Sequence, residues 1–519
     1  MLSLILHAHL PFVRHRENDF LAGNWLFEAV AECYIPLLQM LDALAARPPL
    51  PAAHRPPAPI TFTLTPTLCA MLGDELLQKR LADRFTQILA LAEKEVVRNA
   101  AEPRMQALAE FYRTRWQNAA AYFAASERDL LARFRRHYQD GRLEIMTCAA
   151  THAVLPLLLD RRAVLRQLRV GVNSFREIFD RAPRGCWLPE CAYSPEVGAA
   201  LREAGITYTV LAAHAFLYGA PRPRRGVYAP GRTPDGLWVF GRDPESSKQV
   251  WSARDGYPGA AAYREFYRDL GWDGDADYLR EFYVAPARHD LGFKYHRVTG
   301  EVGLDRKELY DPTAAAAQAV RHARHFLAAR QQQTARLTER LGAEPLIVAP
   351  YDAELFGHWW YEGPQFLTEI LTRAADYGVA PTNPAAVIDA GKIMPSAFAP
   401  AVSSWGDGGY FFTWLNGEND WLYPPLRAAQ KLLNDLEDDG TANRALLRQM
   451  QRELLLAQAS DWTFILTTRT LPDYARRRLT EHLQNFQRLA ERLNAAPAET
   501  AWQQELTKQN NLFADSVLG

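Results

Sequence analysis

Cysteine is scarce in this sequence, and the number and spacing of the cysteines argue against a disulfide-stabilised domain and against a zinc-stabilised domain. The 519 residues include five cysteines, Cys33, Cys69, Cys148, Cys186 and Cys191. An odd, sparse set is not a disulfide framework. No Cys-x-x-Cys pair with matching histidine spacing is present, so a structural zinc site is not indicated. We expect buried free thiols.

Net charge is also nearly absent. Lys and Arg number 59 and Asp and Glu number 60, which gives a formal charge of −1. Proteins that bind duplex nucleic acid or anionic membranes present a basic face, so we expect neither partner. The chain shows no basic leader and no apolar run long enough to cross a bilayer. We expect a cytoplasmic protein; the oligomeric state is open, with a monomer favoured.

The residues that are abundant indicate a large folded protein. Hydrophobic residues make up 48% and charged residues 23% of the chain, which is typical of globular proteins. The length predicts two or three domains. Aromatic residues reach 11%, with 13 tryptophans.

Short, continuous apolar runs predict a parallel sheet, because strands buried on both faces do not alternate with polar residues. The runs are Leu2–Leu6, Ile60–Leu64, Leu143–Thr147, Gly185–Leu188, Tyr208–Leu211, Leu237–Phe240 and Leu346–Ala349. Helical patterns separate most of them. This alternation predicts an α/β fold with a closed or nearly closed parallel β/α barrel.

Two segments depart from a simple barrel. Residues 75–135 read as continuous helix after the second strand, which predicts a helical insertion. From about Leu426 the chain is helical again, over Leu426–Leu436, Ala445–Ala459 and Ala475–Leu493. We therefore predict a barrel domain over residues 1–398 and a helical domain over residues 399–519.

Polar side chains follow several of the predicted strands. Active sites of parallel β/α barrels form at the carboxyl ends of the strands. The residues at those ends are His7, His9, His152, Glu190, Asp352 and Glu354. Two carboxyl groups on one rim, with tryptophans beside them, indicate glycoside chemistry, since tryptophan faces stack on sugar rings.

Other interpretations of these residues remain open at this point. Glu190 follows a proline and could cap the next helix. Asp352 and Glu354 are two residues apart, and composition does not choose between them. His7 and His9 could bind a metal, donate hydrogen bonds to sugar hydroxyls, or complete the core. A metal-dependent carbohydrate deacetylase and a non-catalytic glucan-binding protein are the alternatives from other classes.

The combination of motifs resembles a known family. The segments 7–11 (His-Ala-His-Leu-Pro), 187–193 (Trp-Leu-Pro-Glu-Cys-Ala-Tyr) and 350–359 (Pro-Tyr-Asp-Ala-Glu-Leu-Phe-Gly-His-Trp) look like signature regions of glycoside hydrolase family 57. Further matches lie at 241–246, 249–252, 256–259, 403–406, 414–416 and 460–462. The resemblance covers nearly the whole chain in the expected order, and among family members it is greatest to the 1,4-α-glucan branching enzymes.

The resemblance implies a (β/α)7 barrel with a helical insertion and a C-terminal helical domain that reaches the active site. It implies a retaining branching reaction on an α-glucan, with Glu190 as nucleophile and Asp352 as general acid/base. An α-amylase-like hydrolase or a 4-α-glucanotransferase of the same family is the alternative. No metal or other cofactor is expected.

The resemblance also implies a set of substrate contacts. The predicted substrate-binding residues are His7, His9, His152, Trp187, Trp251, Trp359, Trp405, Trp414 and Asp461. The segment Phe216–Gly236 is rich in Gly, Pro and Arg and is a candidate lid, with Tyr218 and Tyr228 as its aromatic residues.

Overall fold

Seven parallel strands close into a barrel in the computed structural model, which describes residues 1–15, 20–46, 58–252, 255–284, 287–440, 442–493 and 500–518. The strands are β1 (Leu2–Ala8), β2 (Ile60–Leu64), β3 (Glu144–Cys148), β4 (Cys186–Trp187), β5 (Tyr208–Leu211), β7 (Trp238–Gly241) and β8 (Ile347–Asp352). Pairing runs β4-β3-β2-β1-β8 and β5-β7. The parallel bridges Gly185–Tyr208 and Arg242–Val348 join the two groups into a ring. The predicted (β/α)7 barrel is confirmed.

The strands form where the apolar runs predicted them because both of their faces are covered. Every residue of β1 and β2 is buried, as a sheet packed against helices on its outside and side chains on its inside requires. Two short strands, β6 (Gly231–Arg232) and β9 (Ser396–Ala397), add to the outside of β7. They fasten the segment before β7 to the barrel wall.

Helices surround the barrel, and several begin at a side-chain cap. They include α1 (Phe20–Glu28), α2 (Ile35–Ala45), α8 (Arg161–Phe179), α9 (Pro195–Glu203), α11 (Pro244–Trp251), α14 (Pro312–Leu341), α15 (Gly363–Arg373) and α16 (Pro384–Ala390). Asp311 caps α14 by accepting from the backbone N–H groups of Thr313 and Ala314. A π-helical turn (Ala29–Tyr34) joins α1 to α2.

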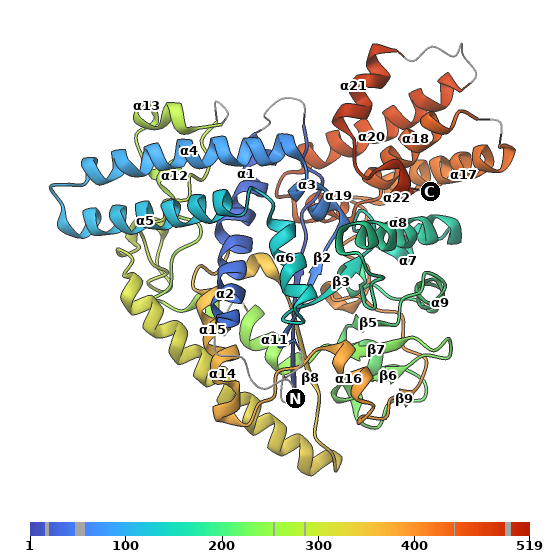
Figure 1. Ribbon diagram of the computed structural model, residues 1–519, viewed down its shortest axis with the longest axis horizontal. Helices are drawn as coiled ribbons and strands as arrows, with labels where there is room; N and C mark the ends of the chain where they lie inside the picture. Colours follow the sequence, from blue (N-terminus) through green and yellow to red (C-terminus); the bar gives the residue numbers. More distant parts are fainter. Residues whose placement is uncertain are drawn as a thin grey trace.

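Two helical regions extend from the barrel (Figure 1). The first contains α4 (Glu75–Arg98) and α5 (Pro103–Ala125), which project together as an antiparallel pair, and α6 (Leu130–Gln139). The second is formed by α17 (Tyr423–Asp439), α18 (Arg444–Ala457), α19 (Ser460–Thr468), α20 (Pro472–Arg492), α21 (Ala501–Gln509) and α22 (Asp515–Leu518). The domain boundary at residues 398/399 stays a prediction.

An irregular segment between α11 and α14 lies against the α4–α5 pair. Among its described residues it contains the short α-helices α12 (Leu270–Asp273) and α13 (Ala276–Leu279) and several 3-10 turns. Tyr112 of α5 donates a hydrogen bond to the Lys294 carbonyl at 2.6 Å. Tyr295 donates to Glu95 of α4 at 2.9 Å. These contacts fix a loop-rich surface beside the barrel.

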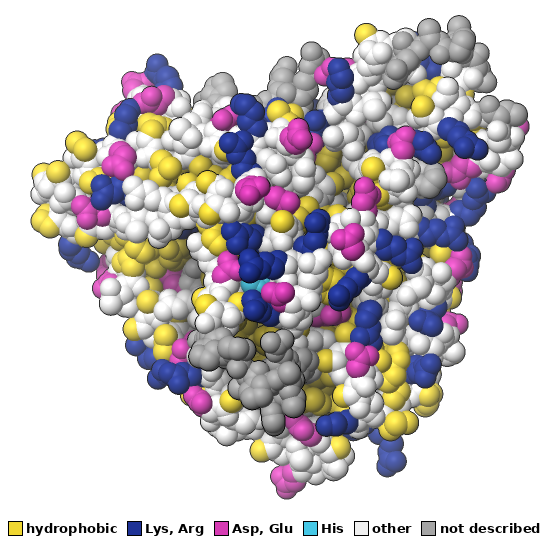
Figure 2. Space-filling model, in the orientation of Figure 1, with side chains coloured by type: hydrophobic (Ala, Val, Ile, Leu, Met, Phe, Trp, Pro, Cys, Tyr) yellow, Lys and Arg dark blue, Asp and Glu magenta, His cyan; other side chains and the backbone are white. Residues whose placement is uncertain are grey.

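The surface carries both signs of charge. Figure 2 shows Lys and Arg interspersed with Asp and Glu over one face of the molecule, with no large area of one sign. Among the helices of the described residues, none has the length and apolar character needed to cross a bilayer.

A buried ion pair joins α14 to the segment after β7 and gives a test of this packing. Arg330 is fully buried and lies 3.1 Å from Glu245 and 3.7 Å from Asp243. We expect Arg330→Met to lower the free energy of unfolding by about 3–5 kcal/mol, because it leaves the buried Asp243 carboxylate without its cation. Urea unfolding followed by circular dichroism measures this loss.

Arg336 is the matched control for that experiment. It lies on the same helix and pairs with the same Glu245 at 2.6 Å, but its side chain is 60% exposed. Water already screens its charge, so Arg336→Met should change the free energy of unfolding by less than about 1 kcal/mol. Equal losses in the two variants would contradict a structural role for the buried pair.

Candidate active site

Glu190 lies at the carboxyl end of β4 in a strained backbone conformation. Its φ and ψ are 61° and 22°, in the left-handed region that residues with a side chain rarely adopt. Its carbonyl accepts a hydrogen bond from the Trp405 backbone N–H at 2.9 Å. Its carboxylate accepts from the Trp405 indole at 2.8 Å and from the Ser460 hydroxyl at 3.2 Å. Strain maintained by surrounding contacts is typical of functional sites.

Three histidines stack beside Glu190. His9 and His152 have ring centroids 3.9 Å apart, and His7 stacks on His152 at 5.0 Å. The Nε2 atoms of His7 and His152 are 2.9 Å apart, so one donates to the other. His152 Nδ1 is 2.8 Å from the Ser460 hydroxyl. A hydrogen-bonded chain therefore runs from His7 through His152 and Ser460 to Glu190.

The histidines do not converge on one point as metal ligands would. His9 Nε2 lies 3.1 Å from Asp461, and its Nδ1 lies 3.1 Å from the Thr65 hydroxyl, whereas His7 faces His152. Burial lowers the pKa of both His7 and His152 well below the ordinary value. Both rings are therefore neutral near pH 7, and they can donate or accept hydrogen bonds there.

Asp352 ends β8 on the same rim. Residue His7 of β1 pairs in register with Asp352, which places the two strand ends side by side. Glu354 lies two residues further along the chain. Its Oε1 atom accepts hydrogen bonds from the Tyr34 hydroxyl at 2.6 Å and from the His9 backbone N–H at 3.1 Å. These bonds fix the Glu354 side chain against α1–α2 and β1. Asp352 is therefore the other carboxyl group of β8 that can act beside Glu190.

The carboxyl groups differ in how strongly they hold a proton. Burial raises the pKa of Glu190 to about 7, while the hydrogen bonds from Trp405 and Ser460 counteract the rise. Burial raises the pKa of Asp352 well above the ordinary value, and the nearby carboxylates of Glu354 and Glu190 raise it further. The surroundings of Asp352 thus favour its protonated form, while the hydrogen bonds to Glu190 favour the carboxylate of that residue. This is the pair that retaining glycoside chemistry requires.

The C-terminal helices contribute directly to this site. Ser460 and Asp461 begin α19 and reach Glu190 and His9 respectively. The Ser460 backbone N–H also donates to the His152 carbonyl at 3.1 Å. Segments of the chain almost three hundred residues apart thus share one hydrogen-bond network.

Three of the predicted tryptophans have accessible rings near this rim. Trp405 and Trp251 line one open pocket beside Arg242 and His214. Trp251 is 37% exposed and Trp359 is 49% exposed. Gly357 makes the turn before Trp359: its φ is 116°, and a Cβ there would lie 1.9 Å from the Glu32 carbonyl.

Two of the predicted substrate-binding tryptophans lie in the interior. Trp187 and Trp414 are buried, with exposed fractions of 0% and 1%, and their role in substrate binding stays a prediction. Trp187 stacks under His7 at 4.9 Å and meets Trp405 edge-on at 5.1 Å. Trp414 packs in an apolar cluster with Val154. Both residues pack behind the residues that line the site.

The predicted lid residue Tyr228 is bound to the barrel wall, and its role as a lid residue stays a prediction. Its carbonyl accepts from the Leu346 N–H at 2.9 Å, one residue before β8, so it lies at the amino end of the strand that carries Asp352 at its other end. Gly231–Arg232 is held in the sheet between β7 and β9. Tyr218, at the end of α10 (Ala213–Leu217), is 73% exposed, and its role as a lid residue stays a prediction.

Several site residues were not assigned from the sequence. Ser460 and Arg242 lay within the matched segments, but nothing in their spacing pointed to Glu190 or Asp352. The Arg242 guanidinium lies over the Trp405 ring at 5.2 Å and opposes the raised pKa of Asp352. Tyr34 and Thr65 come from other elements and had no recognisable signal.

Comparison with known proteins identifies the family. Residues 3–389 match the model of glycosyl hydrolase family 57. This chain belongs to glycosyl hydrolase family 57. Residues 424–516 of this family 57 chain match a second model, that of the C-terminal region of 1,4-alpha-glucan branching enzymes.

The similar proteins and structures are named for two different activities, branching enzyme and alpha-amylase. The chain is 30% identical to a 1,4-alpha-glucan branching enzyme of Thermococcus kodakarensis, with 100% of this chain and 78% of that protein covered. The crystal structure of that enzyme superposes with a TM-score of 0.88, covering 100% of this chain and 96% of the other. The alpha-amylase AmyC of Thermotoga maritima superposes with a TM-score of 0.91 at 37% identity, covering 100% and 98%.

Proposed function

We propose that this family 57 chain is a retaining 1,4-α-glucan branching enzyme. It would cleave an α-1,4 linkage and transfer the released chain to a 6-hydroxyl group, which creates an α-1,6 branch. The observation that carries the proposal is the branching-enzyme match over residues 424–516, because this region supplies Ser460 and Asp461 to the rim of the barrel. The substrate is uncharged, in keeping with a site lined by aromatic rings and neutral histidines.

The two carboxyl groups divide the chemistry. Ionised Glu190 attacks the anomeric carbon while protonated Asp352 gives its proton to the leaving glycosidic oxygen, so the C–O bond breaks as a glucosyl ester forms. The 6-hydroxyl of another glucan chain then attacks the anomeric carbon, and the bond between that carbon and the Glu190 oxygen breaks. Asp352 takes the hydroxyl proton, and Glu190 leaves as a carboxylate.

The surrounding residues would bind the sugar rings. His9, His152 and Asp461 form a polar wall beside Glu190 that suits hydroxyl groups, with His7 behind it. Trp405, Trp251 and Trp359 would stack on successive glucose units. No cofactor takes part in this scheme, and the cytoplasmic location and monomeric state remain predictions.

A second candidate is an α-amylase-like hydrolase that uses the same carboxylate pair. The similarity to AmyC over the whole chain favours it. The two activities differ only in what attacks the ester: water in one case and a sugar hydroxyl in the other. Transfer requires that water be kept from the ester and that an acceptor be held near it.

Incubation with amylose distinguishes the two candidates. A branching enzyme should create α-1,6 linkages, seen by ¹H NMR and by the new chains that isoamylase releases, with no matching rise in reducing ends. An increase in reducing ends alone would contradict the proposal and establish the hydrolase.

The role of Glu190 is tested by Glu190→Gln. Glutamine keeps the size and the acceptor oxygen but cannot form the ester, so kcat should fall on the order of a thousandfold or more. Retardation in a glycogen-containing native gel should persist, because binding does not need the nucleophile. Turnover close to that of the unaltered enzyme would remove Glu190 from this role.

The proton held by Asp352 is tested through its neighbour. Ionised Glu354 raises the pKa of Asp352. In Glu354→Gln this negative charge is gone, so Asp352 loses its proton at lower pH, and the alkaline limb of the kcat/KM profile should move to lower pH. Glu354→Asp keeps the charge and is the control. An alkaline limb that stays in place in Glu354→Gln would contradict Asp352 as the acid.

A further inference from the structure

Two exposed aromatic side chains line a pocket on the irregular segment beside the barrel. Tyr267 is 68% exposed and Trp272 is 52% exposed. They line the same pocket with Arg268, Asp273, Leu304 and Asp305. Single exposed aromatic residues are common on protein surfaces. Two aromatic rings that line one pocket together with carboxylates are less common and are typical of a ligand-binding surface.

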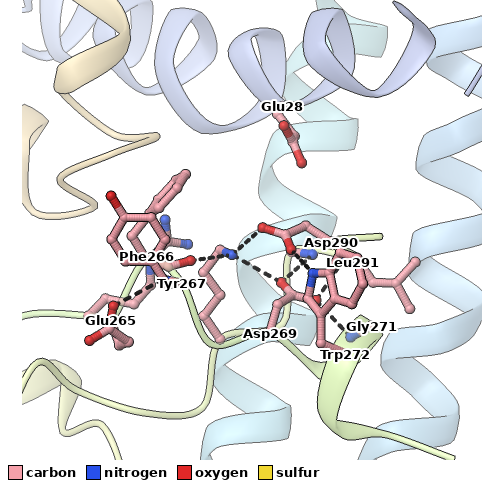
Figure 3. Close-up of polar contacts among 12 residues, drawn as sticks. Glu28, Glu265, Phe266, Tyr267, Asp269, Gly271, Trp272, Asp290 and Leu291 are labelled. Carbon is pink, nitrogen blue, oxygen red and sulfur yellow. Dashed lines mark hydrogen bonds and ion pairs between the residues drawn. The ribbon is translucent and has the colours of Figure 1, made fainter. Parts of the chain in front are cut away.

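A buried ion cluster holds Trp272 in place (Figure 3). The indole N–H of Trp272 donates to Asp290 at 2.6 Å. The other oxygen of Asp290 is 2.6 Å from the ammonium group of Lys294, which also lies 3.3 Å from Asp269. The side chain of Lys294 is 2% exposed and that of Asp269 is fully buried. The exposed indole is therefore anchored to charges in the interior.

The same lysine fixes the segment that carries Tyr267. Lys294 donates to the Phe266 carbonyl at 2.7 Å, and its ammonium group lies 5.0 Å from the centre of the Phe266 ring. The Tyr267 backbone N–H donates to Glu265 at 3.0 Å, which is paired with Lys307 at 3.1 Å. Both exposed rings thus depend on one buried cation.

Burying these charges is costly, so their arrangement calls for a physical reason. Ion pairs taken out of water seldom add stability over well-packed apolar residues. Here they hold two aromatic rings at the surface in fixed positions, where the rings themselves bury little. Such preorganisation reduces the entropy lost when a ligand binds, which favours a binding surface.

Aromatic contacts connect the residues of this pocket to Trp359 of the proposed substrate site. The ring of Phe266 stacks on that of Trp359 with centroids 4.2 Å apart and planes 26° from parallel. Phe266 also meets Tyr267 edge-on at 5.1 Å. The Trp359 N–H donates to the Glu354 carbonyl at 3.2 Å. A row of three aromatic rings thus leads from Trp359, whose backbone is bonded to that of Glu354, outward through Phe266 to Tyr267 and its pocket.

We propose that Tyr267 and Trp272 form a second α-glucan-binding platform outside the catalytic cleft. The rings would stack on the C–H faces of glucose units, while Asp273, Asp305 and Arg268 accept or donate hydrogen bonds to hydroxyl groups. The platform holds a more distant part of the polymer whose nearer part lies at Trp359. The choice of an α-glucan rests on the proposed function.

Binding without turnover provides the first test. The Glu190→Gln protein and the same protein with Tyr267→Ala and Trp272→Ala are compared in native gels containing amylopectin. The loss of two stacking faces should raise the apparent Kd about fivefold or more. Because both proteins lack the nucleophile, the result does not depend on whether the active enzyme branches or hydrolyses its substrate.

Two controls separate stacking from general damage. Tyr267→Phe keeps both ring faces and the hydrogen bond that anchors Trp272, and it should retain most of the binding. Met394→Ala removes an apolar side chain that is 76% exposed outside this pocket, and it should bind amylopectin like the parent. Unchanged retardation of the double alanine variant would overturn the platform, as would equal loss in the Met394→Ala control.

Polymer length provides the second test, in the enzyme with Glu190 intact. Tyr267→Ala with Trp272→Ala should raise the KM for amylopectin about fivefold more than the KM for a short maltooligosaccharide, because only the polymer spans both sites. An equal effect on both substrates would overturn the proposal. If the chain binds amylopectin through these residues but creates no α-1,6 linkages, the branching activity fails and the platform stands.

Discussion

Ser460 joins the C-terminal helices to the barrel through three hydrogen bonds, two to His152 and one to Glu190. The arrangement proposed for catalysis depends on this contact. Without it Glu190 would be a carboxylate buried at a strand end with the Trp405 indole as its one strong donor, and His152 would lose the partner that orients its ring. Asp461, the next residue, positions His9 in the same way. The helical region therefore completes the site, and the barrel alone does not contain it.

Backbone strain and electrostatics converge on the same residues. Both His152 and Glu190 adopt positive φ values, 59° and 61°, at the point where the Ser460 contacts hold them. Burial raises the pKa of Glu190, Asp352 and Glu354, and hydrogen bonds partly reverse this rise for Glu190 and Glu354. The pKa of Asp352 is raised further, because its neighbours Glu354 and Glu190 are carboxylates. A difference in proton affinity between two acids of similar strength thus arises from their partners.

The tryptophans fall into two groups that composition does not distinguish. Trp187 and Trp414 are buried and shape the site from behind, whereas Trp251, Trp359 and Trp272 present accessible rings. Each accessible ring outside the cleft needs an anchor, and for Trp272 this is the Asp290–Lys294 pair. Trp272 thus combines a rigid attachment to the interior with a ring face open to solvent.

The seven strands were predictable from the sequence because each is a short apolar run, and Ile60–Leu64 and Tyr208–Leu211 match the structure residue for residue. Glu190 and Asp352 were recognisable because they lie directly at strand ends within motifs. The partners of these residues were not, because Ser460, Tyr34 and Arg242 approach from elements far away in the chain. The burial of Trp414 and the place of Tyr228 were equally hidden. Local sequence thus determined which elements form and which residues carry reactive groups; tertiary packing alone decided which groups are desolvated, hydrogen-bonded or exposed, since those properties belong to contacts between distant segments.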